Sequence, residues 1–301
     1  MKTRSYPLSI PPRRYALGCF AGALAFVCAS RARAKATAVA PRNSPWKNWI
    51  VYYGADADCE TLSSYDVIIL DPAFKGSIEK CQAKGAKTLA YLSLGEISKT
   101  SAFFPLLDDP GALLSENANW PGAFRADVRK PAWRALILKK AVPELVSRGF
   151  SGIFFDTLDT PPYLEKSDPE RFKGMRAAAI DLVRAIRRRF PRIILAMNRG
   201  YELLPDIVQE IDAVIAESFV TTHNFDSRDY RWNEPALVAQ QNELLRPARE
   251  RSPPMPVLSL DYWDPADPKT IHEIYRRERA MGNIPYVGAL LLDQIVPEPL
   301  T

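Results

Sequence analysis

Short apolar runs alternate with helix-length segments along most of the chain. The runs are three to seven residues long, are rich in Val, Ile, Leu and aromatic side chains, and end in polar residues. Such runs are typical of parallel strands that are buried on both faces. We predict strands at 49–54, 67–70, 88–94, 153–155, 193–197, 213–216, 256–260 and 286–292.

The segments between these runs have helical character. In the segment 170–189, Ile180, Val183 and Ile186 recur at helical spacing opposite a basic face that we expect to be solvated. We predict helices at 56–64, 77–84, 131–149, 170–189, 203–210, 235–249 and 269–281. Eight strands alternating with helices over about 250 residues predict an α/β fold, a single-domain (β/α)8 TIM barrel. An open doubly wound sheet is the alternative, but no strand is followed by a Gly-rich phosphate loop.

Three stretches depart from this alternation. Residues 103–120 have no clear period, and we expect a loop insertion over one end of the barrel. Thr160, Pro161 and Pro162 are expected to break regular structure after the strand at 153–155. Residues 221–233 are expected to form a long polar connection.

The first 34 residues have the pattern of a secretory signal peptide. Residues 1–14 carry four basic side chains and no acid, residues 15–30 are apolar or small, and Ala-x-Ala cleavage sequences follow. A membrane anchor is the alternative, but the apolar run of 16 residues is shorter than the roughly 20 that a spanning helix needs. We therefore expect a signal peptide at 1–34, a linker at 35–45 and the barrel at 46–301. The protein would be exported, periplasmic or secreted, with no stable membrane insertion after cleavage.

Charge, cysteines and histidines narrow the function further. The formal net charge is +5, but six of the 40 Lys and Arg residues and none of the 35 acids lie in the first 34 residues. The remaining chain has 34 basic and 35 acidic residues, hence no basic excess to bind nucleic acid. Cys59 and Cys81 could pair or stay as buried thiols. His223 and His272 have no ligand-like spacing, so we expect no metal centre and no cofactor.

Polar residues follow the predicted strands, and a barrel gathers the carboxyl ends of its strands on one face. Asp favours caps and turns, which explains part of such a set. Six of the eight strand-end residues are nevertheless acidic, although the chain after residue 34 is nearly neutral. The strand-end residues are Asp71, Glu96, Asp156, Asn198, Arg199, Glu217, Asp261 and Asp293.

An acidic mouth attracts cationic ligands. Two carboxylates flanking a bond, without metal ligands or a Ser–His pair, are the equipment of glycoside hydrolysis. Aromatic residues beside these positions could stack on sugar rings or pack inside the barrel; they are Tyr52, Tyr53, Tyr91, Phe219, Tyr262 and Trp263.

An ordered set of motifs resembles the endo-α-1,4-polygalactosaminidase family of barrels, most closely hydrolase domains of the Pel polysaccharide-processing type. The resemblance spans about residues 46–296, nearly the whole chain after the linker. Its motifs are Tyr-Tyr-Gly at 52–54, Tyr-Leu-Ser-Leu-Gly-Glu at 91–96, Asp-Val-Arg-Lys-Pro-Ala-Trp at 127–133, Gly-Phe-Ser-Gly-Ile-Phe-Phe-Asp-Thr-Leu-Asp at 149–159, Asn-Arg-Gly-Tyr-Glu-Leu-Leu-Pro at 198–205 and Ala-Glu-Ser at 216–218.

The resemblance implies an endo-acting hydrolase of α-1,4-linked galactosamine or N-acetylgalactosamine polysaccharide, which is cationic where it is deacetylated. It implies Asp156 as nucleophile and Glu217 as general acid/base of a retaining mechanism, with the order of the two roles open. It also implies a set of substrate-binding residues: Tyr53, Tyr91, Glu96, Asp127, Asp159, Asn198, Arg199, Asp261 and Tyr262.

Two other functions remain open at this point: a carbohydrate-binding barrel without turnover, and a hydrolase of a different glycan. The barrel hypothesis makes a geometric prediction that separates mechanisms. The carboxyls of Asp156 and Glu217 should face each other at about 5–5.5 Å for retention, or roughly 6.5–9.5 Å for inversion.

Overall fold

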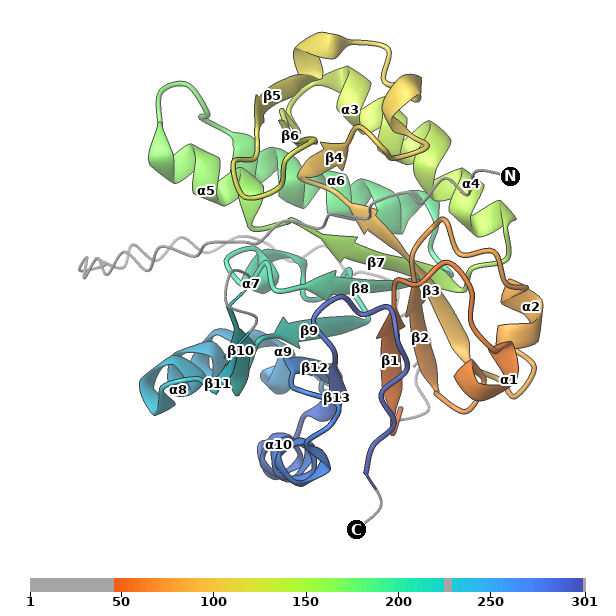
Figure 1. Cartoon of the computed structure of the whole chain (residues 1–301). Helices are drawn as coiled ribbons and strands as arrows, with labels where there is room; N and C mark the ends of the chain where they lie inside the picture. Colours follow the sequence, from red (N-terminus) through yellow and green to blue (C-terminus); the bar gives the residue numbers. More distant parts are fainter. Residues whose placement is uncertain (1–45, 225–228, 300–301) are drawn as a thin grey trace.

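The computed structural model describes residues 46–224 and 229–299. The expected signal peptide and linker lie outside the described residues. Eight parallel strands form one sheet that curls into a nearly closed barrel, which confirms the TIM-barrel prediction (Figure 1). In spatial order the strands are β1 (Trp49–Tyr52), β2 (Val67–Leu70), β3 (Lys87–Ser93), β7 (Gly152–Asp156), β8 (Ile194–Asn198), β9 (Ala213–Glu217), β12 (Val257–Tyr262) and β13 (Ile284–Gly288).

Side chains join the first and last strands and complete the barrel. The Trp49 indole N–H of β1 donates to the backbone oxygen of Ile284 on β13, at 2.8 Å. The rings of Trp49 and Tyr286 pack edge to face, with their centroids 5.9 Å apart. Beyond the strands, the backbone N–H of Tyr53 donates to Leu292 O at 2.7 Å. Both ends of the strand order are therefore held side by side.

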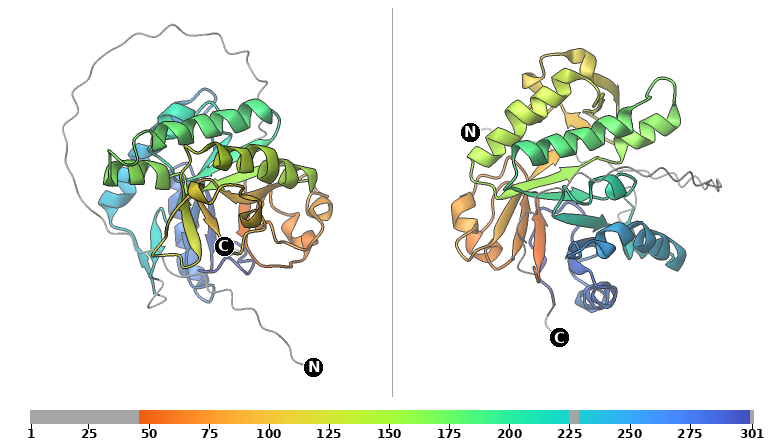
Figure 2. Two further views of the ribbon diagram at one scale, coloured as in Figure 1. Left: turned by 90° about the horizontal axis from the view of Figure 1, so that it is seen from above. Right: turned by 180° about the vertical axis from the view of Figure 1, so that it is seen from behind.

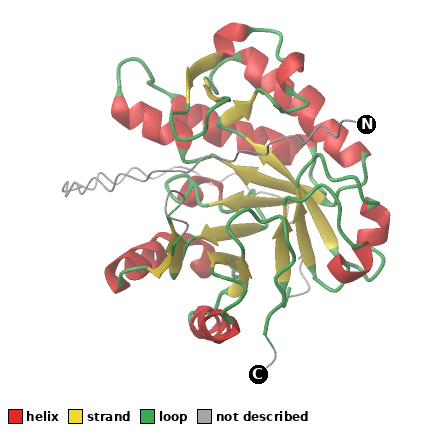
Figure 3. Cartoon of the chain, in the orientation of Figure 1, coloured by secondary structure: helices red, strands yellow, loops and turns green. Residues whose placement is uncertain are grey.

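Helices lie outside the strands, as Figures 2 and 3 show from different sides. The long helix α6 buries Ile180, Val183 and Ile186 against the barrel, as its spacing predicted. None of the helices in the described ranges is long and apolar enough to cross a membrane. The helices are α1 (Cys59–Leu62), α2 (Ile78–Cys81), α3 (Pro131–Leu136), α4 (Val142–Ser147), α5 (Thr160–Ser167), α6 (Met175–Arg189), α7 (Leu204–Ile207), α8 (Pro235–Leu244), α9 (Arg246–Glu250) and α10 (Pro268–Ala280), with a π-helical stretch at Ile137–Ala141 joining α3 to α4.

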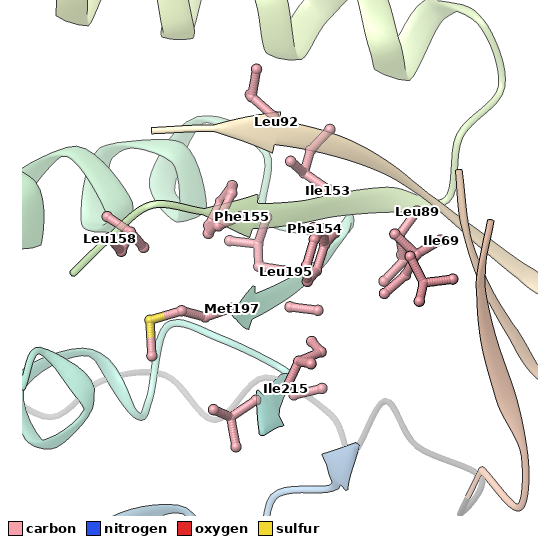
Figure 4. Packing of buried hydrophobic residues seen from close by; sticks show 14 of the residues in the cluster. Ile69, Leu89, Leu92, Ile153, Phe154, Phe155, Leu158, Leu195, Met197 and Ile215 are labelled. Atoms are coloured by element: carbon pink, nitrogen blue, oxygen red, sulfur yellow. The ribbon is translucent and has the colours of Figure 1, made fainter. Parts of the chain in front are cut away.

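The core fills the space between neighbouring strands with apolar side chains. Figure 4 shows part of this buried cluster, with Ile69 of β2, Leu89 of β3, Phe154 of β7, Leu195 of β8 and Ile215 of β9 among its members. All five are at most 3 % exposed. Burial on this scale contributes roughly 25 cal/mol for each Å² of apolar surface removed from water. A rigid frame of this kind holds the strand ends in fixed positions.

The structure corrects three of the expectations for irregular stretches. The insertion at 103–120 is not only loop, because β5 (Leu113–Glu116) pairs with β6 (Ala123–Ala126), which also pairs with β4 (Glu96–Ser98). Pro161 and Pro162 begin α5 rather than break structure, since the first helical turn needs no backbone donor there. The connection at 221–233 contains a hairpin of β10 (Thr221–His223) and β11 (Tyr230–Trp232).

The last two barrel strands have different ends from those predicted. Strand β12 continues through Asp261 and Tyr262, and β13 stops at Gly288 instead of Leu292. After Gly288 the chain turns, with Leu292 N bonded to Ala289 O at 3.0 Å. Asp293 therefore lies beyond this turn and not at a strand end.

A disulfide joins Cys59 of α1 to Cys81 of α2, which decides between the two alternatives left open for these cysteines. The two residues are 22 positions apart in sequence, and their Cα atoms are 4.5 Å apart. The bond ties together the two short helices between β1 and β3. Neither helix has more than four residues, so neither would be stable alone.

Candidate active site

Three polar side chains end three neighbouring strands of the barrel. Asp156 is the last residue of β7, Asn198 of β8 and Glu217 of β9, and these strands are adjacent in the sheet. Parallel strands present their carboxyl ends at the same rim, so the three side chains meet there. Asp156 and Glu217 are half-buried, and Asn198 is 6 % exposed.

The amide of Asn198 bridges the two carboxylates. Its Nδ2 donates to Asp156 Oδ1 at 3.1 Å and to Glu217 Oε2 at 2.7 Å. The two N–H bonds of an amide diverge by about 120°, so these two oxygens lie about 5 Å apart. The two carboxylates therefore face each other across the Asn198 amide.

Each carboxylate also accepts a hydrogen bond from a tyrosine. Tyr91 on β3 donates from its hydroxyl to Asp156 Oδ2 at 2.9 Å. Tyr262, the last residue of β12, donates to Glu217 Oε1 at 2.7 Å. The Tyr53 ring packs edge to face on Tyr91, with centroids 5.6 Å apart. Every oxygen of the two carboxylates thus has a positioned donor, which fixes their orientation.

The residue after each of these strand ends adopts the left-handed backbone conformation. Thr157 has φ 61°, Arg199 has φ 49° and Ser218 has φ 53°. This conformation is uncommon outside glycine and is strained for a β-branched residue such as threonine. The Thr157 hydroxyl is tied into the rim, where it donates to Asp156 O (2.7 Å) and accepts from Gly95 N (2.9 Å). The same local bend at three adjacent strands turns the chain away from the rim immediately after each site residue.

Glu96 and Asp127 lie near this rim in networks of their own. Glu96 is 6 % exposed and accepts from the Asn117 amide (3.0 Å to each oxygen) and the Thr160 hydroxyl (2.9 Å). Asp127 is 4 % exposed and forms a two-point ion pair with Arg129. Burial opposes the ionisation of Asp127, but the Arg129 guanidinium outweighs it and lowers the pKa of this carboxyl. Sequence reasoning did not identify Asn117, because it lies in the stretch interpreted as a loop.

Asp159 and Arg199 remain accessible in part. Asp159 is half-buried and precedes α5, three residues after Asp156. Arg199 is half-buried beside Asn198, and its backbone N–H donates to Ile215 O at 2.9 Å. Both remain candidates for contacts with substrate, at the edge of the carboxylate pair.

Asp261 does not reach the rim. Its side chain is 0 % exposed and accepts from the backbone N–H groups of Val220 (3.0 Å) and Thr221 (2.7 Å). Successive side chains of a strand point to opposite faces, and the next residue, Tyr262, points to Glu217. Asp261 therefore points away from the rim, and a substrate cannot touch it in this structure.

His223 lies beside these residues, although no role was assigned to it from the sequence. Its ring packs edge to face on the Tyr262 ring with centroids 4.6 Å apart. Burial lowers the pKa of His223 to about 4, against the opposing charge of Glu217. The hairpin of β10 and β11 places His223 beside Tyr262. This hairpin was missed from the sequence because residues 221–233 were interpreted as an irregular polar connection. Within residues 46–224 and 229–299, no group of three or more His, Cys, Asp or Glu side chains is placed to hold a metal ion.

Comparisons with known proteins point in one direction. The sequence pattern of glycoside-hydrolase family GH114 matches residues 28–299. The glycoside hydrolase domain of PelA from Pseudomonas aeruginosa is 26% identical with a TM-score of 0.75, over 84% of this chain and 99% of that one. Ega3 of Aspergillus fumigatus, solved in complex with galactosamine, shares the fold at 16% identity and TM-score 0.61, over 85% and 96%. An uncharacterized protein of Deinococcus radiodurans is 26% identical over 250 residues, 78% of this chain and 76% of that protein.

Proposed function

This chain belongs to glycoside-hydrolase family GH114, and from that membership we propose that it cleaves α-1,4-linked galactosamine or N-acetylgalactosamine polysaccharide internally, with retention. The observation that carries the proposal is the carboxylate pair of Asp156 and Glu217, bridged by one amide. The two bridged oxygens lie about 5 Å apart, which supports the 5–5.5 Å spacing of retaining glycosidases over the roughly 6.5–9.5 Å of inverting ones.

The retaining mechanism assigns one role to each carboxylate. Asp156 attacks the anomeric carbon while Glu217 gives its proton to the leaving glycosidic oxygen, and a covalent glycosyl ester forms on Asp156. A water molecule then attacks the same carbon, gives its proton to Glu217, and releases the sugar from Asp156. The Asn198 amide holds both carboxylates toward the same centre throughout.

An amino-sugar polymer suits the charge of this rim. The tyrosine hydroxyls and the amide that donate to Asp156 and Glu217 within the described residues are uncharged. These bonds orient the carboxylates without neutralising them, and Asp159 adds a third acid nearby. Protonated amines of a partly deacetylated chain are attracted to such a rim. Ega3 was solved with galactosamine bound, and that complex concerns Ega3 alone. For this chain, the identity of the sugar is part of the proposal.

The test is release of reducing ends from partially deacetylated α-1,4-galactosaminan by residues 46–301. Wild type should release them, and Asp156→Asn and Glu217→Gln should each lose at least about 10³-fold in kcat. Glu243→Gln on α8, whose side chain is 66% exposed, is the matched control and should keep full activity. Retention is read from the first product anomer by NMR, which should be α.

The possible outcomes separate the proposals. Polymer binding without release by any variant would support a carbohydrate-binding barrel instead. Neither binding nor release would leave the family intact and reject this glycan. A β product would reject retention alone.

We further propose export through the signal peptide at 1–34, with the linker at 35–45 preceding the barrel domain at 46–301. The supporting observation is the sequence pattern of these residues. N-terminal sequencing of the protein from outside the cytoplasm should give a start between residues 35 and 41, and a start at Met1 would reject cleavage.

A further inference from the structure

Two acidic side chains are completely buried against each other between the barrel and a helix. Asp261 on β12 and Glu278 on α10 are each 0 % exposed. Asp261 points away from the catalytic rim, toward the helix layer, since its neighbour Tyr262 points to Glu217. The two carboxyl groups lie close enough to interact directly, by charge and, when one of them is protonated, by a hydrogen bond.

The hydrogen bonds around this pair leave one oxygen of each carboxyl unsatisfied, and a proton between them would satisfy both. Asp261 Oδ1 accepts from Val220 N (3.0 Å), Thr221 N (2.7 Å) and Thr221 Oγ1 (3.1 Å). Glu278 Oε2 accepts from the Asn283 amide at 2.6 Å. The remaining oxygens, Asp261 Oδ2 and Glu278 Oε1, are buried and accept no well-formed hydrogen bond in the described part of the chain, although the Ser259 hydroxyl lies near Glu278. Two ionised carboxylates cannot donate, so a hydrogen bond between these oxygens needs a proton on one of them.

The surrounding charges favour a location of the proton on Asp261. The cation facing the pair is Arg249 of α9, whose guanidinium donates to Asn283 Oδ1 at 2.7 Å and acts on Glu278 by its charge. The neutral groups facing it are the hydroxyls of Tyr201, Ser259 and Thr221. One guanidinium balances one carboxylate, which is Glu278, and Asp261 is then the neutral acid. Burial and the nearby Glu278 raise the pKa of Asp261, and burial raises that of Glu278, in agreement with a retained proton.

The pair is connected to the catalytic rim through the segment after Glu217. Asp261 fixes the backbone at residues 220 and 221, while Ser218 N donates to Leu260 O at 2.7 Å. Only three residues separate Glu217 from Thr221. The residue next to Asp261 is Tyr262, which donates to Glu217. The Asp261 side chain therefore anchors the segment that follows Glu217, and it directly precedes the tyrosine that donates to Glu217.

We propose that Asp261 and Glu278 share one proton, with Asp261 as its donor, and that this pair positions Glu217 and Tyr262 for catalysis. The inference rests on the proposed catalytic role of Glu217. Asp261 is a positioning residue and does not touch substrate. Its neutral form provides one oxygen to accept from the loop and one hydroxyl to donate to Glu278.

Asp261→Asn is the decisive variant, because an amide copies this arrangement without a removable proton. Its Oδ1 can accept from the loop and its Nδ2 can donate to Glu278. We expect Asp261→Ala to lower kcat by about 10- to 100-fold with little change in KM, since a misplaced catalytic group affects the chemical step. Asp261→Asn should restore kcat to within about threefold of wild type.

Two readouts do not depend on turnover. At neutral pH the infrared difference between wild type and Asp261→Asn should contain the carbonyl stretch of a protonated carboxylic acid, and the difference between wild type and the surface control Asp109→Asn should not. The pKa of Asp261 is higher in the folded state than in the unfolded state, so wild type loses stability as pH rises above the unfolded value. Asp261→Asn has no such proton, and its advantage in Tm over wild type should therefore grow with pH.

Absence of the carbonyl band, or a constant Tm difference across pH, would overturn the shared proton even if Asp261→Ala does not fold. Wild-type kcat in folded Asp261→Ala would overturn the positioning role. If wild type releases no reducing ends from galactosaminan while the infrared band is present, the proposed function fails and the proton-bound pair stands.

Discussion

Replacing Asn198 with alanine should cost more activity than any other change of an uncharged residue at the rim. The variant removes one amide nitrogen that donates at 3.1 Å to Asp156 and at 2.7 Å to Glu217. A hydrogen bond to a charged group contributes about 1.5–3 kcal/mol, so the two bonds contribute about 3–6 kcal/mol in total. Each 1.4 kcal/mol of transition-state stabilisation corresponds to about a tenfold change in rate. We expect kcat/KM to fall by about 10²- to 10⁴-fold.

The assay is reducing-end release, with Tm measured on the same samples. The fall should appear mainly in kcat, because Asn198 orients the reacting groups and substrate binding uses other contacts as well. Asn233→Ala is a matched control, since this amide donates to Ser218 O at 2.8 Å behind Glu217 without contacting either carboxylate. A kcat/KM within threefold of wild type for Asn198→Ala would refute the bridging role. An equal loss in Asn233→Ala would attribute the effect to general loosening of the loop.

Three further predictions concern the surroundings of this pair. Tyr91→Phe and Tyr262→Phe each remove one donor to a carboxylate, and each should lower kcat by about 10- to 100-fold with Tm nearly unchanged; wild-type kcat in both would contradict it. Burial lowers the pKa of His223 from 6.5 to about 4, so the unfolded state binds more protons between these pH values. Stability should therefore decrease as pH falls through this window, by about 2–3 kcal/mol, and urea unfolding of His223→Phe should lack this component. Replacing Cys59 and Cys81 together with serine should lower the unfolding free energy by about 3 kcal/mol, since the bond closes a 22-residue loop, while kcat of the folded enzyme stays unchanged.

Much of the fold followed from the sequence because its strands are buried on both faces. A strand such as Val67–Leu70 is apolar throughout, and its predicted and observed bounds agree. The boundaries were wrong where the apolar pattern and the hydrogen-bond ladder diverge. Leu290 to Leu292 continue an apolar run, yet the chain turns after Gly288. The hairpin with His223 was missed because two three-residue strands give too short a pattern to recognise.

The sequence by itself determined the barrel, the rim and the two carboxylates. Asp156 and Glu217 each end an apolar run, and a parallel barrel must bring such ends to one side. The local sequence is sufficient to place these two residues, because it shows where each apolar run ends.

Only the tertiary structure decided which polar groups serve the rim. Asp261 and Tyr262 are adjacent in sequence, yet one is buried behind the barrel wall and the other donates to Glu217. A strand turns successive side chains to opposite faces, so an error of one residue in its end exchanges the two roles. The bridge through Asn198 and the contact of His223 with Tyr262 likewise depend on which strands are neighbours and how the hairpin folds back. These contacts depend on how the elements pack in three dimensions, and the order of residues along the chain does not reveal this packing.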